Sequence, residues 1–228
     1  MNLLDARHLT RTLQGEIPVT LVRDVDVTVG IGEFVAITGP SGSGKSSLLY
    51  LLGLLDRPTS GTVTVDGQDT SKLNEDALAR FRLEKMGFIF QFHFLLAEFT
   101  ALENVMLPMR RLGRLSERDI RDRARGLLKD LGLEEQSDKL PKQMSGGQAQ
   151  RVAIARALSN KPRLILADEP TGNLDSASSH NVQTILKDLA ATGDCSVVAV
   201  THDTDFADFA GRRIHVVDGV ITDHRLQP

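Results

Sequence analysis

The clearest chemistry in the sequence lies in residues 39–46, which read GPSGSGKS. An apolar run typical of a strand precedes this stretch, and a second apolar run, typical of a helix, follows it. A glycine-rich turn in this context can direct successive backbone N–H groups at one anion, and the following helix adds the positive end of its dipole. Lys45 brings a mobile positive charge, and the Ser46 hydroxyl is placed to bind Mg²⁺. The stretch therefore predicts a nucleotide-binding loop made of Gly39, Pro40, Ser41, Gly42, Ser43, Gly44, Lys45, Ser46 and Ser47.

Two other apolar runs also end in polar residues. Residues 163–169 (RLILADE) end in Asp168 and Glu169, and residues 196–202 (SVVAVTH) end in His202. Continuous apolar runs suit parallel strands that are buried on both faces. In open α/β sheets ligands bind at the carboxyl ends of the strands, so we expect these residues and the loop to share one edge. A helix cap is the competing interpretation of the two acids, but it gives little reason for placing both at the end of a buried strand.

A second candidate anion site lies at residues 144–148, MSGGQ, just ahead of an amphipathic helix. The Ser145 side chain and the N–H groups of Gly146 and Gly147 would surround an anion at the start of that helix. One chain therefore carries two phosphate-binding devices. Either it binds two phosphates at distant places, or two copies face each other and share a nucleotide.

The composition is that of an ordinary globular protein, with 228 residues, 41% of them hydrophobic and 25% charged. A net charge of −3 gives no general basic field for nucleic acid. The single cysteine, Cys195, excludes a disulfide framework and fits a reducing compartment as a packing thiol. The N-terminus lacks the pattern of a signal peptide, and no apolar run is long enough to span a bilayer. We therefore expect a cytosolic protein that reaches a membrane only through a partner.

The rest of the sequence predicts the strands and helices that position these residues. Residues 19–29 and 62–65 alternate between apolar and polar side chains, as half-buried strands do. Another strand ends near Phe90 and leaves Gln91 at its tip. Helix starts are indicated at Asn74, Thr100, Ser116 and Asn181.

From about residue 92 to 158 the pattern is helical, with no strand. We therefore predict an α/β protein with a P-loop NTPase core. Its sheet is mostly parallel, an antiparallel β subdomain is attached, and a helical subdomain is inserted at about 92–158 in a single domain that spans 1–228.

Phe92, Phe94 and Phe99 lie beyond the strand, in a predicted loop. Apolar side chains in such a place either pack into the core or form a contact site for another molecule. The sequence favours neither alternative.

The motifs occur in an order that resembles the ATP-binding subunits of ABC transporters over nearly the whole chain. The matching segments are the Walker A loop at 39–46, a Q-loop glutamine at Gln91, the signature at 144–148, Walker B at 164–168, Glu169, a D-loop at 173–175 and a switch histidine at His202. Residues 91–96, 100–104 and 168–175 resemble one branch, which holds the lipoprotein-releasing (LolD-like) and macrolide-export (MacB-like) ATPases. The cell-division (FtsE-like) ATPases are its neighbours.

This resemblance implies a head-to-tail homodimer that encloses two ATP molecules. The signature residues of one copy, Ser145, Gly146, Gly147 and Gln148, would meet the nucleotide held by the other copy, with Asp175 at the dimer interface. The partner would be a polytopic membrane subunit, and the chain would lie peripherally on the cytoplasmic face of the inner membrane. Hydrolysis would drive lipoprotein release or efflux. In the cell-division alternative it would move the membrane partner without transport.

The resemblance also implies roles for single residues, with ATP and Mg²⁺ as cofactors. Ser46 and Gln91 would bind Mg²⁺, and Asp168 would reach the ion through a water. Lys45 would neutralise phosphate charge, Glu169 would polarise the attacking water, and His202 would contact the γ-phosphate.

Two positions depart from the family pattern. Met144 stands where leucine is usual, which conserves volume and apolar character. Leu13 stands where the family usually stacks an aromatic ring on adenine. A small-molecule P-loop kinase would share only the Walker A loop, and relatives that act on nucleic acid carry coiled coils or a second cassette, which are lacking here.

Overall fold

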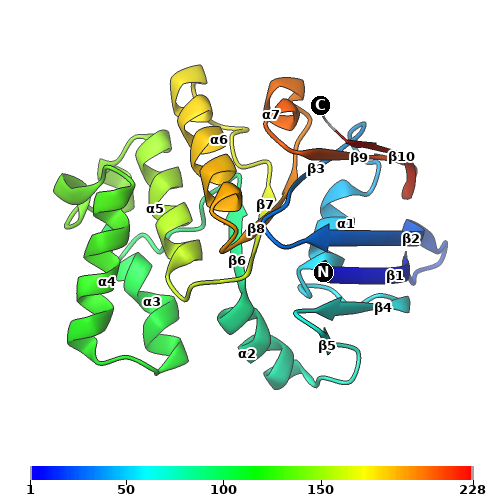
Figure 1. The fold of residues 1–228 in the computed structure, drawn as a ribbon, viewed down its shortest axis with the longest axis horizontal. Helices are drawn as coiled ribbons and strands as arrows, with labels where there is room; N and C mark the ends of the chain where they lie inside the picture. The colour runs from blue at the N-terminus through cyan, green and yellow to red at the C-terminus, as the bar shows by residue number, and fades with distance from the viewer. Residues whose placement is uncertain (1, 227–228) are drawn as a thin grey trace.

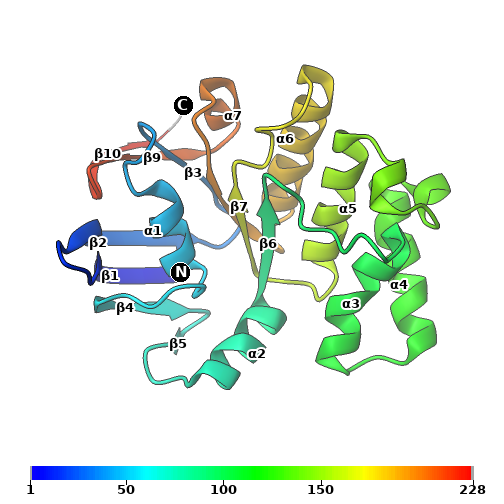
Figure 2. The same ribbon diagram turned by 180° about the vertical axis from the view of Figure 1, so that it is seen from behind.

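The computed structural model describes residues 2–226, which form two sheets with helices packed beside them (Figures 1 and 2). The strands are β1 (Asn2–Leu13), β2 (Val19–Gly30), β3 (Phe34–Thr38), β4 (Ser60–Val65), β5 (Gln68–Asp69), β6 (Met86–Phe90), β7 (Leu164–Asp168), β8 (Ser196–Val200), β9 (Arg212–Val217) and β10 (Val220–Leu226). The helices are α1 (Lys45–Leu52), α2 (Glu75–Lys85), α3 (Ala101–Leu112), α4 (Glu117–Asp130), α5 (Gly146–Leu158), α6 (Ser176–Ala191) and α7 (Thr204–Asp208), with short 3₁₀ turns η1 (Glu134–Gln136) and η2 (Pro141–Gln143).

The larger sheet has the strand order β10-β9-β3-β8-β7-β6. All neighbouring strands from β9 to β6 are parallel, and only β10 runs antiparallel, to β9. The central strands β7 and β8 are almost wholly buried because their apolar runs are covered on both faces. A mostly parallel sheet is therefore present, as the sequence predicts.

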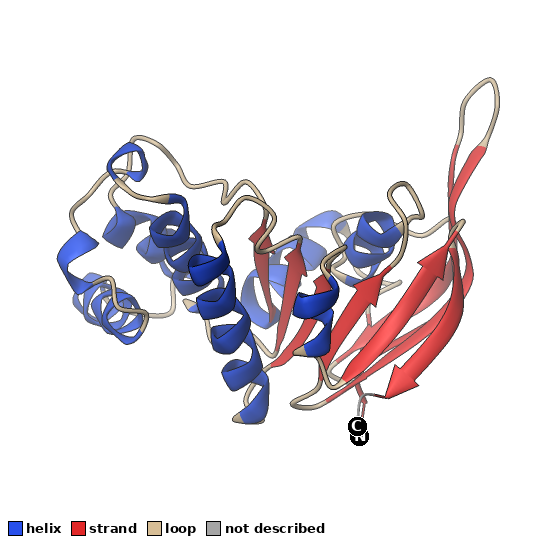
Figure 3. Cartoon of the chain, turned by 90° about the horizontal axis from the view of Figure 1, so that it is seen from above, coloured by secondary structure: helices blue, strands red, loops and turns tan. Residues whose placement is uncertain are grey.

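The smaller sheet is antiparallel, in the order β2-β1-β4-β5. In β2 the side chains of Val25, Val27 and Val29 are buried while those of Asp24 and Asp26 are exposed, because neighbouring side chains point to opposite faces. The long hairpin of β1 and β2 projects from the rest of the molecule (Figure 3). The sequence pattern indicated β2 and β4, but it did not indicate β1 or the terminal hairpin of β9 and β10.

Helices α3, α4 and α5 lie together on the side of the larger sheet that is remote from the antiparallel sheet (Figures 1 and 2). Their buried side chains, among them Val105, Ile120 and Val152, form an apolar cluster of their own. Helix α3 begins with the predicted capping box, in which Thr100 and Glu103 each accept a hydrogen bond from the other residue's backbone N–H. We propose that residues 92–158, approximately, form the inserted helical subdomain, and the separate apolar cluster supports this proposal.

Helix α6 begins at Ser176, five residues before the predicted start at Asn181. The reason is a cap: Asp175 accepts a hydrogen bond from the Ser178 backbone N–H at 2.9 Å. Cys195 is buried, and this burial raises the pKa of its thiol to about 12, which suits a packing residue. Among residues 2–226, no helix combines the length and the apolar character needed to cross a membrane.

Candidate functional site

The chemistry-bearing residues follow four neighbouring parallel strands at one edge of the larger sheet. The nucleotide-binding loop follows β3, His202 lies just beyond β8, Asp168 ends β7, and Gln91 is the first residue after β6. The strand order β3-β8-β7-β6 makes these four positions consecutive along the edge. The predicted gathering at the carboxyl ends of the strands is therefore present in the structure.

The loop that follows β3 forms a tight cradle. Lys45 is buried, and its ammonium group donates hydrogen bonds to the carbonyl oxygens of Gly39 at 2.9 Å and Pro40 at 2.7 Å. Gly44 has a φ of +95°, where a side chain would also run into the Leu21 carbonyl oxygen. Among the described residues 2–226, the buried Ser43 hydroxyl has no hydrogen-bond partner. An unpaired buried hydroxyl beside a movable lysine at a helix start is a donor set that fits a phosphate group.

A cluster of oxygen atoms lies where α1 meets the end of β7. The Ser46 hydroxyl donates to Asp168 Oδ1 at 3.0 Å, and the Tyr50 hydroxyl donates to Asp168 Oδ2 at 2.9 Å. Hydroxyl and carboxylate oxygens are ligands that Mg²⁺ accepts. Burial, with a smaller effect from Asp168, raises the pKa of Tyr50 to about 12, so its phenol stays protonated and remains a donor.

Glu169 and His202 form a pair at the ends of β7 and β8. His202 Nδ1 lies 2.8 Å from Glu169 Oε1. The Glu169 side chain is 18% exposed, whereas that of His202 is 70% exposed. Glu169 also has a φ of +48°, and its backbone N–H donates to the Val200 carbonyl oxygen. A shielded carboxylate beside an exposed imidazole can accept a proton from water and can orient a bound anion.

Gln91 is tied to the segment that contains the predicted D-loop. Its Nε2 donates to Asn173 Oδ1 at 3.2 Å, and Asn173 Nδ2 donates back to the Gln91 carbonyl oxygen at 3.3 Å. Gly172 lies so close that a Cβ atom there would approach Gln91 Nε2 to 2.8 Å. This interaction places the Gln91 amide beside the loop that follows Glu169.

The residues after Gln91 are tied in turn to α5. Arg156 donates to the carbonyl oxygens of His93 and Phe94, each at 2.6 Å. Both acceptor residues have left-handed backbone conformations, with φ of +54° for His93 and +48° for Phe94. Arg156 thus holds two successive strained residues, and one side chain links this segment to the signature helix.

The signature residues form a regular helix start. Ser145 Oγ accepts from the Gln148 backbone N–H at 3.3 Å, and Gln148 Oε1 accepts from the Ser145 N–H at 3.0 Å. Gly146 and Gly147 are the first residues of α5, where N–H groups lack partners within the helix. Strands β6 and β7 lie between α1 and α5 in both views (Figures 1 and 2). The cradle and the signature are therefore apart within one chain.

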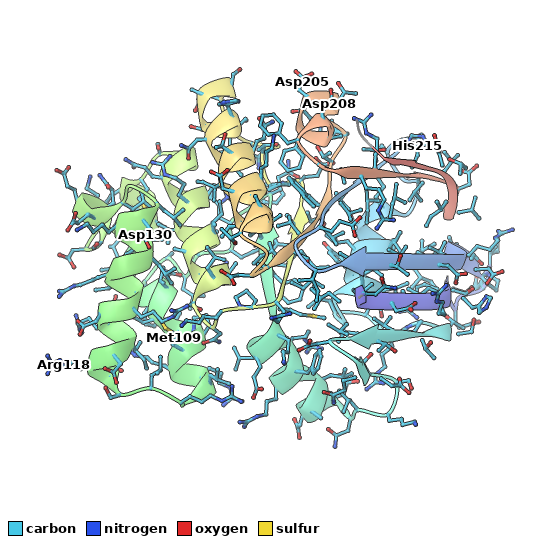
Figure 4. All side chains as sticks on the ribbon, in the orientation of Figure 1. Met109, Arg118, Asp130, Asp205, Asp208 and His215 are labelled. Carbon is cyan, nitrogen blue, oxygen red and sulfur yellow. The ribbon has the colours of Figure 1, made fainter. Side chains whose placement is uncertain are left out.

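Two open hollows flank His202 and Asp203. One, of about 530 Å³, is lined by Thr38, Gly39, Pro40, Arg213 and His215, among others. The other, of about 600 Å³, is lined by Glu169, Gly172, Leu174 and Ser179, among others. Figure 4 shows Asp205 and Asp208 on α7 and His215 on β9; His215 lines the first hollow and Asp205 the second. The Glu169–His202 pair therefore faces open space.

The protein-family model described as "ABC transporter" matches residues 22–172, which contain the cradle, Gln91, the signature, Asp168 and Glu169. The chain belongs to the ABC transporter family. This cassette is 54% identical over 209 residues to "Lipoprotein-releasing system ATP-binding protein LolD 1" of Chlorobium chlorochromatii (strain CaD3), covering 92% of this chain and 85% of that protein. It is 50% identical to the LolD protein of Anaeromyxobacter dehalogenans (strain 2CP-C), covering 91% and 87% of the two chains.

A solved structure extends the comparison to the fold. The cassette matches the dimeric post-hydrolysis structure of the ATP-binding cassette MJ0796 bound to ADP and Pi, with a TM-score of 0.91 and 42% identity over 98% of each chain. The predicted family and fold class are confirmed. The chain is an ATP-binding subunit of the ABC type and an ATPase, as predicted from its motifs.

The structure adds three residues that contact the predicted site residues and that the sequence analysis did not connect with them. These are Tyr50, Asn173 as the partner of Gln91, and Arg156. Only Tyr50 carries a signal in the sequence, because it follows Ser46 by four positions on a predicted helix and so must share its face.

Proposed function

We propose that the chain hydrolyses ATP as a head-to-tail homodimer and drives a polytopic membrane subunit in lipoprotein release. The observation that carries this proposal is that β6 and β7 lie between α1, which follows the cradle, and α5, whose first residues belong to the signature. A second copy that presents its signature to the cradle would complete the nucleotide site with a closed two-fold symmetry. The lipoprotein substrate is inferred from the names of the LolD relatives.

We assign roles to residues from the chemistry of the site. The backbone of the loop, Lys45 and Ser43 would hold the phosphates, and Ser46 with Gln91 would bind Mg²⁺ while Asp168 reached it through water. Bound Mg²⁺ would neutralise part of the phosphate charge. Glu169 would take the proton of the attacking water, which is worth roughly 10²–10⁴-fold in rate.

His202 would serve as the sensor of the γ-phosphate. Its imidazole is exposed and within hydrogen-bond distance of Glu169, so it can turn toward a phosphate while it still positions the carboxylate. Ser145, Gly146, Gly147 and Gln148 would act on the nucleotide of the partner, and Asp175 would lie at the dimer interface.

A groove beside β6 supports a docking place for the membrane subunit, on the cytoplasmic face of the membrane. It has a volume of about 320 Å³ and is lined by Leu55, Leu83, Phe88 and Pro108, among others. Phe92 and Phe94, in the loop that follows β6, are 70% and 61% exposed, whereas Phe99 is half-buried. We propose that Phe92 and Phe94 contact a short helix of that subunit and that Phe99 packs inward.

A mixing experiment tests the shared site. Lys45→Ala disables the cradle, and Ser145→Arg blocks the signature, so each variant alone should lack ATPase activity. If the site is shared, a one-to-one mixture contains heterodimers with one intact site, and it should recover about a quarter of the wild-type rate. A mixture that stays inactive while each variant still folds would contradict the head-to-tail dimer.

A further inference from the structure

Two hydroxyl groups from one face of α1 hold the two oxygens of a single carboxylate. Ser46 donates to Asp168 Oδ1 at 3.0 Å, and Tyr50 donates to Asp168 Oδ2 at 2.9 Å. The two donors are four residues apart, so the helix places them on the same side, one turn from each other. Asp168 itself is fixed as the last residue of β7, which pairs with both β6 and β8.

The Tyr50 phenol is held in position by its surroundings. The side chain is half-buried and packs against the larger apolar core beneath the nucleotide-binding loop. The Tyr50 carbonyl oxygen accepts hydrogen bonds from the backbone N–H groups of Leu55 at 2.9 Å and Asp56 at 3.3 Å. The ring is therefore fixed by packing and by the end of α1, so its hydroxyl meets Asp168 at little cost in side-chain entropy.

The two hydroxyl groups have different roles when Mg²⁺ binds. In the function proposed above, the Ser46 oxygen is itself a ligand of Mg²⁺, so this hydroxyl would serve both the ion and Asp168 Oδ1. Tyr50 has no such task, so its bond to Oδ2 persists. We propose that Tyr50 is a positioning residue of the magnesium site, which keeps Asp168 oriented with Oδ1 toward the ion's water shell. This inference rests on the proposed assignment of Asp168.

A group that orients a metal-linked carboxylate is characteristically worth about 10–100-fold in metal affinity. Removing the phenol hydroxyl alone should therefore act on Mg²⁺ rather than on the nucleotide. In Tyr50→Phe, the Mg²⁺ concentration that gives half-maximal ATPase activity should rise about tenfold or more. The KM for ATP at saturating Mg²⁺ should stay within about twofold of wild type, since no phosphate contact is removed.

Thr70→Val provides the matched control. The Thr70 hydroxyl is buried and donates to the Val63 carbonyl oxygen at 2.7 Å, in the antiparallel sheet. This variant also loses one buried hydrogen bond, but far from Asp168 in the fold. It should lose some stability and keep the wild-type Mg²⁺ dependence. If Thr70→Val and Tyr50→Phe shift the Mg²⁺ dependence equally, Tyr50 acts only through stability and the proposal is overturned.

The chain also offers a measurement that does not depend on turnover. It contains one tyrosine and no tryptophan, so 3-fluorotyrosine labels Tyr50 alone. In the Glu169→Gln background with ATP bound, adding Mg²⁺ should shift the ¹⁹F resonance, and the Asp168→Asn variant should abolish that shift. Magnesium should leave the resonance unmoved if the phenol has no part in the metal site.

The outcomes separate this inference from the proposed function. Magnesium-dependent hydrolysis by the wild type, together with an unchanged Mg²⁺ requirement in Tyr50→Phe, overturns the role of Tyr50 and leaves the proposed function intact. A wild-type chain whose hydrolysis and ¹⁹F resonance both ignore Mg²⁺ overturns the two together. A raised Mg²⁺ requirement with an unchanged KM for ATP supports the inference.

Discussion

His202 Nδ1 and Glu169 Oε1 lie 2.8 Å apart at the ends of two neighbouring parallel strands. The pairing of β7 with β8 and the left-handed conformation of Glu169 set this distance. The base and the sensor of the proposed reaction are therefore placed side by side by the fold of these two strand ends. In that reaction the γ-phosphate and the water would meet a pair whose spacing is set by the backbone.

Glu169→Gln should keep ATP binding and lower turnover by about 10²–10⁴-fold, because an amide cannot accept the proton of the attacking water. The variant should also accumulate as an ATP-bound dimer, since the closed state is no longer emptied by hydrolysis. Light scattering with and without ATP measures the dimer, and phosphate release measures turnover. Hydrolysis at the wild-type rate would refute the assignment of Glu169 as the base.

Replacing Phe92 or Phe94 with serine should weaken the complex with the membrane subunit and spare ATP binding. Both side chains are largely exposed, so their loss should change the free energy of unfolding by less than about 1.5 kcal/mol, even for Phe94, whose ring meets that of Phe90. Co-purification with the membrane subunit and a denaturant titration provide the two readings.

Leu115→Ser is the control for these phenylalanines, because Leu115 is 45% exposed and lies outside the loop after β6. It should leave complex formation unchanged. Unfolding of the Phe92 or Phe94 variants would instead assign these rings to the core.

Leu13 predicts weak discrimination between nucleobases. It lies at the end of β1 and is 44% exposed, so it offers an aliphatic surface where an aromatic ring would add roughly 1–3 kcal/mol of stacking. GTP should therefore be hydrolysed within about tenfold of ATP, a difference of about 1.4 kcal/mol. Leu13→Tyr should tighten ATP binding more than GTP binding.

Competition titrations of ATP against GTP on the isolated chain measure this preference. Ile17→Tyr, at the exposed turn of the same hairpin, should leave it unchanged. Strong selectivity for ATP in the wild type would show that another residue contacts the adenine.

His93 predicts a loss of stability in mild acid. Burial, and to a smaller extent the charge of Arg156, lower the pKa of His93 below its ordinary value of 6.5. The unfolded chain then binds the proton more readily than the folded chain, so stability is complete above pH 6.5 and falls as the pH drops below it. His93→Asn, which tolerates the left-handed backbone, should flatten this dependence.

Thermal unfolding between pH 5.5 and 7.5 compares the two chains. His180→Asn is the control, since it removes a histidine from α6 and should keep the wild-type slope. An equal slope in His93→Asn would mean that other groups dominate the acid response.

The sequence was most informative where one short stretch predicts a strand or helix and also contains the polar residues at its end. The apolar runs that end at Asp168 and His202 implied buried parallel strands, and strand direction alone then placed their ends together. The cap at Thr100 was visible for the same reason, because a capping box lies within four residues of the sequence. Such patterns can be predicted because they involve residues that are close together in the sequence.

The contacts that the sequence did not reveal join residues that are far apart along the chain. Asn173 meets Gln91 across 82 positions, and Arg156 reaches His93 across 63. Neither pairing follows from periodicity, because it depends on how the loops fold back over the sheet edge. The early start of α6 differs from these cases, because it depends on the Asp175 cap, which the prediction of a helix start at Asn181 does not include.

In the proposed head-to-tail dimer, the placement of β6 and β7 between the cradle and the signature would make turnover depend on encounters between chains. A lone copy carries two half-sites, so its rate per molecule should decline steeply on dilution and recover on concentration. A membrane subunit that holds two copies side by side would remove this dependence by raising their effective concentration. Stray copies away from that subunit would then consume little ATP.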